Sequence, residues 1–387
     1  MGRVVARPRL NQDTTMPLVL DDDQQMMRDT AQGFFADKAP VSALRKLRDE
    51  GSETGFDAAL WAEMGEMGFA GVLVAEEDGG LGMGAITAGL IAEAAGANLS
   101  ASPFLSTAVL AARALAHGSD AQRAEWLPKV AAADAIVALA LDEGAKHDPA
   151  RIQTHAEASG NGFKITGNKV MVVDGHVADA LIVAASSNEG VSLFLVPRNA
   201  QGLEIERTEM VDSRNAARVR LEAVEVAGDA LLGPLGGGDT ILEDVLATGR
   251  AVVAAELLGA GQAAFDQTVE YIKGRKQFGV PVGSFQALQH RASHLYAEIE
   301  VARSAVLATL SALDEGHADA GIYAMIAKAK LGEVAKLAAL EGVQMHGGVG
   351  MTDEYDIGLY LKRIRVLQEL LGDANFQADQ LAAARGY

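Results

Sequence analysis

The spacing of apolar residues changes twice along the chain. From about residue 20 to residue 133, apolar positions recur every three or four residues, as they do around Ala59-Leu60-Trp61, and this spacing predicts helices. From residue 136 to about residue 232 the spacing is two, in short runs such as Val137-Ala138-Leu139 that end at turns such as Asn161-Gly162, which predicts strands. From residue 239 onward the helical spacing returns in long segments broken by a few glycines.

Several short strands with tight turns and no helices between them are typical of an antiparallel sandwich or barrel. The predicted fold class is therefore α+β and multidomain, with an N-terminal α-helical domain, a middle antiparallel β domain and a C-terminal helical bundle. Met16-Pro17 resembles a second start, so we expect the residues before it to be disordered. The expected divisions are 1–16 for this extension, 17–133 for the helical domain, 134–235 for the β domain and 236–387 for the bundle.

Composition narrows the range of partners. The formal net charge of -19 argues against nucleic acid, because phosphate contacts need a basic surface. The absence of cysteine excludes disulfides, a thiolate nucleophile, iron–sulfur clusters and cysteine-ligated zinc. No apolar run has the length of a membrane span, and the first ten residues lack the apolar stretch of a secretory signal. We therefore expect a cytoplasmic protein without a membrane span.

Three short segments of the C-terminal zone carry residue types that bind a dinucleotide. They read Arg275-Lys276-Gln277-Phe278-Gly279, Ser284-Phe285-Gln286 and Gln344-Met345-His346-Gly347-Gly348. A guanidinium pairs with a pyrophosphate through two hydrogen bonds, amides bond ribose or adenine edges, and glycines let backbone N–H groups approach phosphate. Any one of these residues alone is better interpreted as a surface residue near a helix end. The combination favours contact with a cofactor.

These segments resemble the C-terminal domain of the FAD-dependent acyl-CoA dehydrogenase family. The stretch 279–291 is similar to small or partner subunits of that family, such as the small subunit of pimeloyl-CoA dehydrogenase, and the resemblance runs from about Met16 to Arg385. It implies a C-terminal four-helix bundle, FAD as cofactor, an acyl-CoA substrate, an electron-acceptor flavoprotein, and a homo- or hetero-tetramer arranged as a dimer of dimers. It also implies residues that reach across a subunit interface to a neighbour's FAD: Arg275, Gln277, Phe278, Gln286, Gln344, Gly347 and Gly348.

The segments that should hold the flavin ring depart from the family pattern. The family's Thr-Glu-Pro-Gly-Ala-Gly-Ser-Asp loop corresponds to residues 141–148, where Lys146-His147 replaces the Gly-Ser pair. The family's Trp-Ile-Thr corresponds to Met171-Val172-Val173, so an aromatic wall becomes a thioether and the hydroxyl that would bond flavin N5 becomes a methyl. Met171 and Val173 are thus expected beside the cofactor, but with hydrogen bonds missing and low flavin affinity.

The reaction that the resemblance implies is α,β-dehydrogenation. A carboxylate takes the proton α to the thioester carbonyl while a hydride leaves the β-carbon for flavin N5. The family places this glutamate at one of two positions, which here are Leu371 and Gly249, and neither side chain can accept a proton. Asp373 is a weak candidate for a relocated base, because an Asp that opens a helix is usually an N-cap. Glu369 should point to nearly the opposite side of its helix from Leu371. The catalytic base is therefore unknown from the sequence.

Two further groups of residues have simpler explanations. His290 and His294 have the spacing of metal ligands on a helix, but no third ligand is apparent, so a structural pair is expected and no metal is assigned. Lys362, Arg363 and Arg365 form a basic run, which is usually a solvated helix face, although an anion or a partner subunit could face it.

Three functions remain open from the sequence. In the first, the chain works beside a second, base-bearing dehydrogenase subunit and contributes the residues that reach a neighbour's FAD. In the second, it is a self-sufficient homo-oligomeric acyl-CoA dehydrogenase with a non-standard base such as Asp373. In the third, it is a non-catalytic scaffold or acyl-CoA-binding subunit. The identity of the acyl chain is not encoded in any motif.

Overall fold

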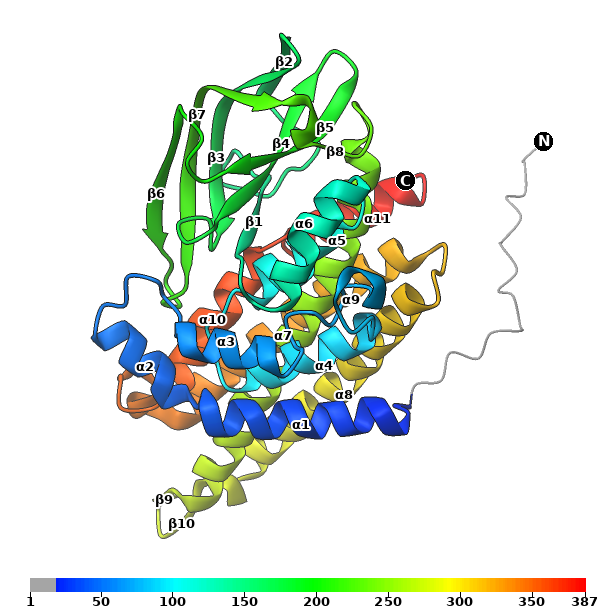
Figure 1. Cartoon of the computed structure of the whole chain (residues 1–387). Coiled ribbons are helices and arrows are strands. Elements are labelled where there is room, and N and C mark those ends of the chain that lie inside the picture. Colours follow the sequence, from blue (N-terminus) through cyan, green and yellow to red (C-terminus); the bar gives the residue numbers. More distant parts are fainter. Residues whose placement is uncertain (1–18) are drawn as a thin grey trace, which may run out of the picture.

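The computed structural model describes residues 19–387, so the expected N-terminal extension lies outside the described residues. The described chain has the predicted order of helices, sheet and helices, and the α+β fold class is confirmed (Figure 1). None of its helices is long and apolar enough to cross a membrane.

The N-terminal part is made of helices that begin at defined caps. Asp21 caps the first helix by accepting a hydrogen bond from the backbone N–H of Gln24, and Ser119 caps a later one through Gln122 in the same way. The helices are α1 (Asp22–Lys38), α2 (Val41–Asp49), α3 (Ala58–Glu66), α4 (Gly84–Ala97), α5 (Ala112–Leu115) and α6 (Asp120–Ala131), with a 3₁₀ turn η1 (Glu76–Asp78) and a π-helical segment η2 (Phe104–Ala111).

The middle part is one mainly antiparallel sheet, with spatial order β6-β7-β3-β2-β4-β5-β8. The exceptions are β1, which pairs with β4 in parallel, and a short parallel contact between β2 and β4 at His155 and Ser186. Both faces of β4 are buried, since Ile182 packs with the helices and Val183 packs in the core of the sheet itself. The strands are β1 (Val137–Ala140), β2 (His155–Ser159), β3 (Gly162–Val173), β4 (Ala180–Ser187), β5 (Gly190–Pro197), β6 (Leu203–Glu209), β7 (Asn215–Ala227) and β8 (Leu231–Leu232). A 3₁₀ turn, η3 (Gly228–Ala230), connects β7 to β8.

The C-terminal part is a bundle in which α7 and α9 lie side by side at the centre. Helices α8 and α10 each pack on both α7 and α9, and the short α11 packs against α9. Helix α7 also packs on α4, so the N-terminal helices and the bundle share one hydrophobic core. The helices are α7 (Gly238–Gly274), α8 (Gln286–Asp314), α9 (Ala320–His346), α10 (Ile357–Glu369) and α11 (Ala374–Ala384); between them lie β9 (Lys276–Gln277), β10 (Val280–Pro281) and the 3₁₀ turns η4 (Val282–Ser284) and η5 (Gly347–Met351).

The basic run on α10 is not one solvated face, and the prediction was wrong for Arg363. Lys362 and Arg365 are exposed, but the side chain of Arg363 is fully buried. The helical period places Arg363 on the same face as the buried residues Tyr360 and Leu367, so it points into the protein.

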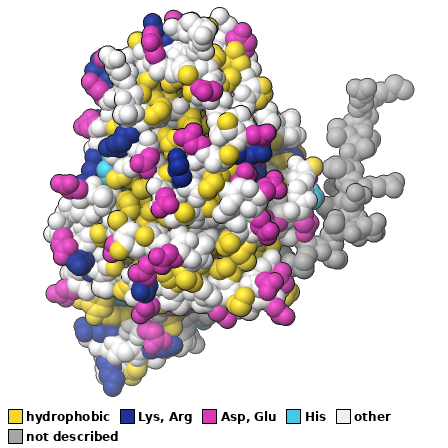
Figure 2. Space-filling model, viewed as in Figure 1, with side chains coloured by type: hydrophobic (Ala, Val, Ile, Leu, Met, Phe, Trp, Pro, Cys, Tyr) yellow, Lys and Arg dark blue, Asp and Glu magenta, His cyan; other side chains and the backbone are white. Residues whose placement is uncertain are grey.

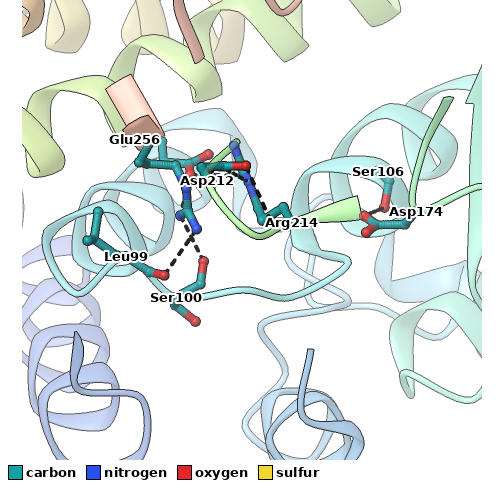
Figure 3. Close-up of polar contacts among 8 residues, drawn as sticks. Leu99, Ser100, Ser106, Asp174, Asp212, Arg214 and Glu256 are labelled. Carbon is teal, nitrogen blue, oxygen red and sulfur yellow. Dashed lines mark hydrogen bonds and ion pairs between the residues drawn. The ribbon is translucent and has the colours of Figure 1, made fainter. Parts of the chain in front are cut away.

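A buried charge cluster compensates for this burial; it consists of Asp212, Arg214, Glu256 and Arg363 (Figure 3). The Nε atoms of Arg363 and Arg214 donate to the same Oδ2 of Asp212, at 2.7 Å and 2.9 Å. Both guanidinium groups also donate to Oε1 of Glu256, at 3.3 Å and 3.1 Å. Two cations therefore face two carboxylates, as a buried ionic group requires.

The cluster joins all three parts of the chain. Asp212 and Arg214 lie in the turn between β6 and β7, while Glu256 lies on α7 and Arg363 on α10. The Nη atoms of Arg363 also donate to the backbone carbonyls of residues 99 and 100 at the end of α4, at 3.1 Å and 3.0 Å. The hydrogen bonds and ion pairs of this one cluster thus connect the sheet, the bundle and the N-terminal helices.

Candidate functional site

The first predicted cofactor segment forms a hairpin at the end of the molecule far from the sheet (Figure 1). Arg275 ends α7, and within residues 19–387 its exposed guanidinium makes no ion pair. Gln277 is also exposed, and Phe278 at the hairpin tip has 91% of its surface exposed, with its ring 6.3 Å from that of Phe285. Lys and Arg side chains gather at this tip, although the chain as a whole is acidic (Figure 2). Such a surface suits an anionic group brought by another molecule.

The third predicted segment, 344–348, lies at the same end of the bundle as the hairpin. The ring of Tyr271, one turn before Arg275, stacks on the ring of His346 with centroids 4.3 Å apart. Gln344 and Gly348 are exposed, as is Gln286 at the start of α8. Gly347 has φ +65° and ψ -143°, and a β-carbon there would meet no atom within 4 Å, so its backbone conformation rather than crowding calls for glycine. The fold thus brings together the residues that the sequence grouped.

Met171 and Val173 lie at the close of β3, where the sheet meets the helices. Met171 occupies a bulge between Lys169 and Val172, where the strand register shifts, and its φ of +53° turns the thioether outward so that 42% of the residue is exposed. Val173 is half-buried against the helical core. The hairpin after Arg275 projects from the end of the bundle away from the sheet (Figure 1), so within one chain it lies apart from the end of β3.

Asp174, which directly follows Val173, is a buried carboxyl group. It accepts a hydrogen bond of 2.6 Å from Oγ of Ser106 on η2 and lies near the buried charge cluster (Figure 3). Burial raises the pKa of Asp174 to about 6, and the hydrogen bond from Ser106 and the charge of Arg214 offset this only in part.

This pKa predicts a pH-dependent contribution to stability. An unfolded Asp titrates near pH 4, so between about pH 4 and pH 6 the folded protein keeps a proton that the unfolded chain releases. The contribution is complete below pH 4 and is lost as the pH rises through 6. Asp174→Asn keeps an acceptor for Ser106, and we expect the free energy of unfolding of the wild type, relative to this variant, to fall by roughly 3 kcal/mol between pH 4 and pH 7. Urea unfolding of both proteins at each pH measures it; parallel curves would contradict the assignment.

The two positions at which the family places its base lie against each other. A β-carbon on Gly249 would be 2.8 Å from Cδ1 of Leu371 and 2.5 Å from Cδ2 of Leu110. Leu371 is 9% exposed. The space where a carboxylate would reach a substrate is therefore filled by two leucine side chains and a helix backbone.

The turn that carries Leu371 is fastened by donors on three helices. Its carbonyl oxygen accepts hydrogen bonds from Nε of Arg250, at 3.1 Å, and Nε2 of Gln377, at 2.8 Å. The buried Nζ of Lys328 donates to the carbonyls of Gln368 and Gly372, at 3.0 Å and 2.9 Å. Lys328 was not predicted as a buried residue, although its place on the helix indicates burial.

The indication of burial is that this lysine lies on an apolar stripe. Lys328 shares its face of α9 with the buried residues Ala324, Leu331 and Ala335, at the spacing of one helical face. Burial, together with the charge of Arg250, lowers its pKa to about 7, and burial lowers the pKa of Arg250 to about 10. Both cations stabilise the backbone of the turn, and neither takes the place of a carboxylate base.

Asp373 forms the N-cap of α11. Its Oδ1 accepts a hydrogen bond from the backbone N–H of Phe376 at 2.9 Å, and its Oδ2 pairs with Nζ of Lys146 at 3.1 Å. The N–H of Phe376, followed by the charge of Lys146, lowers the pKa of Asp373 below its ordinary value. A carboxylate with a lowered pKa and two partners is a poor proton acceptor.

An open cleft of about 830 Å³ lies between the first half of α7, the α8–α9 connection and α11. Its charged and titratable lining consists of Asp239, Glu243, Asp244, Arg113, Arg250 and His317. Asp244 is already paired with Arg113 at 2.5 Å and with His117 at 2.8 Å. With three carboxylates against two guanidinium groups, the cleft is not suited to a polyanion such as the nucleotide part of CoA.

His290 and His294 lie on the exposed face of α8. Across the part of the chain that the structure describes, no group of three potential metal ligands occurs.

Comparison with known proteins identifies the family. Residues 21–134, 138–224 and 236–385 match the N-terminal, middle and C-terminal domains of acyl-CoA dehydrogenase. The acyl-CoA dehydrogenase IpdE2 of Mycobacterium tuberculosis is 33% identical over 352 residues, which are 90% of this chain and 93% of the relative. The chain belongs to the acyl-CoA dehydrogenase family.

Solved structures support the same assignment. A variant of the Tcur3481-Tcur3483 steroid ACAD is 32% identical, with a TM-score of 0.86 over 94% of this chain and 98% of that one. The ChsE4-ChsE5 complex from Mycobacterium tuberculosis contains a chain that is 25% identical, with a TM-score of 0.86 over 95% of this chain and 98% of that one. Acyl-CoA dehydrogenases are FAD-dependent oxidoreductases that act on a CH–CH bond, and some of them are heteromeric.

The chain's own residues do not fit the flavin ring of this family. The methyl groups of Val173 offer no hydrogen-bond donor, and Met171 is turned outward. Two side chains of the 141–148 loop are engaged elsewhere, since Lys146 binds carboxylates of the bundle and Nδ1 of His147 lies 2.9 Å from Oδ1 of Asp142. The hairpin end offers an exposed guanidinium that makes no ion pair within residues 19–387 and a nearby glycine turn, and such groups suit the phosphate-bearing part of a dinucleotide.

Proposed function

We propose that this chain is a subunit of a heteromeric FAD-dependent acyl-CoA dehydrogenase and lends part of the FAD site to a second, base-bearing subunit. The observation that carries the proposal is the contact between Gly249 and Leu371. Of the two positions that the resemblance implies for the base, one is a leucine and the other is a glycine at which even a β-carbon would meet that leucine. A partner must then supply the carboxylate.

The distribution of the cofactor residues supports this division. The hairpin with the exposed Arg275 lies at the end of the bundle away from the sheet (Figure 1), while Met171 and Val173 close β3 where the sheet meets the helices. A chain with this geometry can serve a cofactor bound by a neighbour without binding one with its own β3 strand. The names ChsE4-ChsE5 and Tcur3481-Tcur3483 each pair two different chains, as our proposal requires for this protein. The resemblance to small or partner subunits points the same way.

The other two hypotheses receive less support. A self-sufficient enzyme would need Asp373 to move protons, but this residue caps α11 and pairs with Lys146. A subunit that binds acyl-CoA in its own cleft would have to place a polyanion beside Asp239 and Glu243. We therefore assign the acyl-CoA, the FAD ring and the transfer of electrons to an acceptor flavoprotein to the site that the partner completes.

The proposal is tested by reconstitution. The chain is co-expressed with an acyl-CoA dehydrogenase chain encoded beside it that has a glutamate at the position corresponding to Leu371. We expect a stable complex with bound FAD and dehydrogenase activity, assembled as two copies of each chain. If the two chains elute separately and the second chain alone is fully active, the proposal is wrong.

Arg275→Ala tests the part of the FAD site that this chain is proposed to contribute to its partner. A charge-assisted pair with a pyrophosphate contributes about 1.5–3 kcal/mol, so we expect the complex to bind FAD roughly ten- to a hundred-fold more weakly. The free energy of unfolding of the isolated chain should not change, because the guanidinium makes no ion pair within residues 19–387. Equilibrium titration of the apo-complex with FAD gives the affinity.

Lys273→Ala is the matched control, since this exposed lysine lies two residues before Arg275 and, among the described residues, pairs only with Glu270 of its own helix. The control should retain wild-type affinity. Equal affinities for Arg275→Ala and wild type would remove Arg275 from the site.

A further inference from the structure

The loop that joins β1 to β2 is firmly attached to the sheet at its start. The carboxylate of Glu143 accepts hydrogen bonds from the backbone N–H groups of Gln153 and Thr154, at 2.7 Å and 2.8 Å, and from Nζ of the fully buried Lys169, at 2.7 Å. Burial by itself would raise the pKa of Glu143, but Lys169 and these N–H groups outweigh it and lower the pKa. The base of the loop is therefore fixed, and only its tip can move.

The tip of the loop contacts the bundle through the two residues that depart from the family pattern. Nζ of Lys146 pairs with Oε2 of Glu369, at 2.8 Å, and with Oδ2 of Asp373, at 3.1 Å. These two carboxylates stand on either side of the turn that carries Leu371. The loop thus crosses from the sheet to the position where the family keeps its base.

His147 makes a second contact, of a different kind. Its ring meets the ring of Phe376 on α11 edge to face, with centroids 5.1 Å apart, and its side chain is 2% exposed. Its Nδ1 lies 2.9 Å from the carboxylate of Asp142, which fixes the orientation of the ring. Its Nε2 is buried without a hydrogen-bond partner among the described residues.

We propose that Lys146 and His147 form a latch that holds the loop against the α10–α11 turn and closes the chain's own flavin-ring cradle. The proposal rests on contacts between two separate segments. The loop offers a cation and a ring at the two positions that depart from the family pattern, and the segment around the turn presents two carboxylates and Phe376 to them. This inference deepens the proposed function, on which it rests, because it gives a physical reason why the cradle of this chain does not serve the cofactor.

The two contacts of the latch should respond differently to the salt concentration. The pair between Lys146 and the two carboxylates is exposed and is weakened by salt, whereas the contact between His147 and Phe376 is buried and is not. Raising the salt concentration should therefore loosen the loop only in part, and removal of both side chains should release it.

The test is the double variant Lys146→Gly with His147→Ser, which restores the residue types that the family pattern has at these positions. Hydrogen exchange of residues 141–150 in the isolated chain should become roughly three- to thirty-fold faster than in the wild type. Titration with FAD should show at least about ten-fold tighter binding to the isolated chain, since a freed loop can offer its N–H and hydroxyl donors. Lys164→Ala, which removes an exposed lysine paired with Glu225 inside the sheet, is the control and should match the wild type in both measurements.

Three results would overturn the latch, two of them obtained with the double variant. One is unchanged exchange of the loop in the double variant, and the other is faster exchange without a gain in FAD affinity. Wild-type chain that binds FAD stoichiometrically with the loop protected would also overturn it. The proposed function is judged separately, by the activity of the reconstituted complex, which the double variant should leave unchanged. A latch that opens as expected, in a chain that forms no active complex, would refute the proposed function alone.

Discussion

The isolated chain should oxidise acyl-CoA thioesters roughly 10²–10⁴-fold more slowly than the reconstituted complex, because a positioned base contributes a factor of that order to the rate. Leu371 and Gly249 leave no carboxylate at either base position. The measurement is the reduction of an artificial electron acceptor at saturating FAD, with a series of acyl-CoA chain lengths so that a poor choice of substrate is not mistaken for a missing base.

Asp373→Asn distinguishes the alternatives if the isolated chain is active. Asparagine is as good an N-cap as aspartate, so α11 should stay folded while any base function is lost. Fast turnover by the wild type together with an inactive Asp373→Asn variant would establish a self-sufficient enzyme. Fast turnover by both proteins would mean that the base lies elsewhere in the chain.

Asp212→Ala should lower the free energy of unfolding by about 3–5 kcal/mol, the usual effect of breaking a buried ionic network by removing one partner. The variant leaves the guanidinium groups of Arg214 and Arg363 with only Glu256 between them. Because the cluster joins the sheet to both helical parts, we also expect the sheet to lose its protection from hydrogen exchange before the bundle does.

The control for this prediction is Asp353→Ala. Asp353 pairs with Arg45 and Arg48 at the surface, where solvent screens the charges, so the variant should unfold almost like the wild type. Urea unfolding of all three proteins gives the comparison. Equal effects of the two substitutions would show that the cluster contributes no more than a surface ion pair.

The elements with a clear period were predictable from the sequence. The helical and strand zones follow from the spacing of apolar residues, and the end of a helix near Arg275 was expected from the sequence, although the hairpin that follows it was not. The N-cap at Asp373 was also the favoured interpretation, since short polar side chains at helix starts bind the free N–H groups nearby. These features depend on neighbours in the chain.

The features that were missed depend on contacts between distant segments. The approach of Gly249 to Leu371 joins α7 to the end of α10, and no local pattern encodes it. Arg363 was assigned to solvent because its two carboxylate partners lie in other parts of the chain. The contact of Lys146 with Glu369 and Asp373 was likewise unforeseen, because an exposed lysine can pair with any acidic residue that the fold brings near.

Helix α7 carries both Gly249 and Arg275, which are separated by 26 positions and therefore by about 39 Å along the axis at 1.5 Å per residue. One residue inserted between them would lengthen the helix only slightly but would turn Arg275 by about 100° around the axis. Because buried residues of α7 pack against α4 and α9 on both sides of such an insertion, the same rotation would also turn part of this face out of the core. The core of this chain therefore fixes the distance and the angle between the two positions, and a neighbouring chain in the proposed complex would meet Arg275 in one set direction.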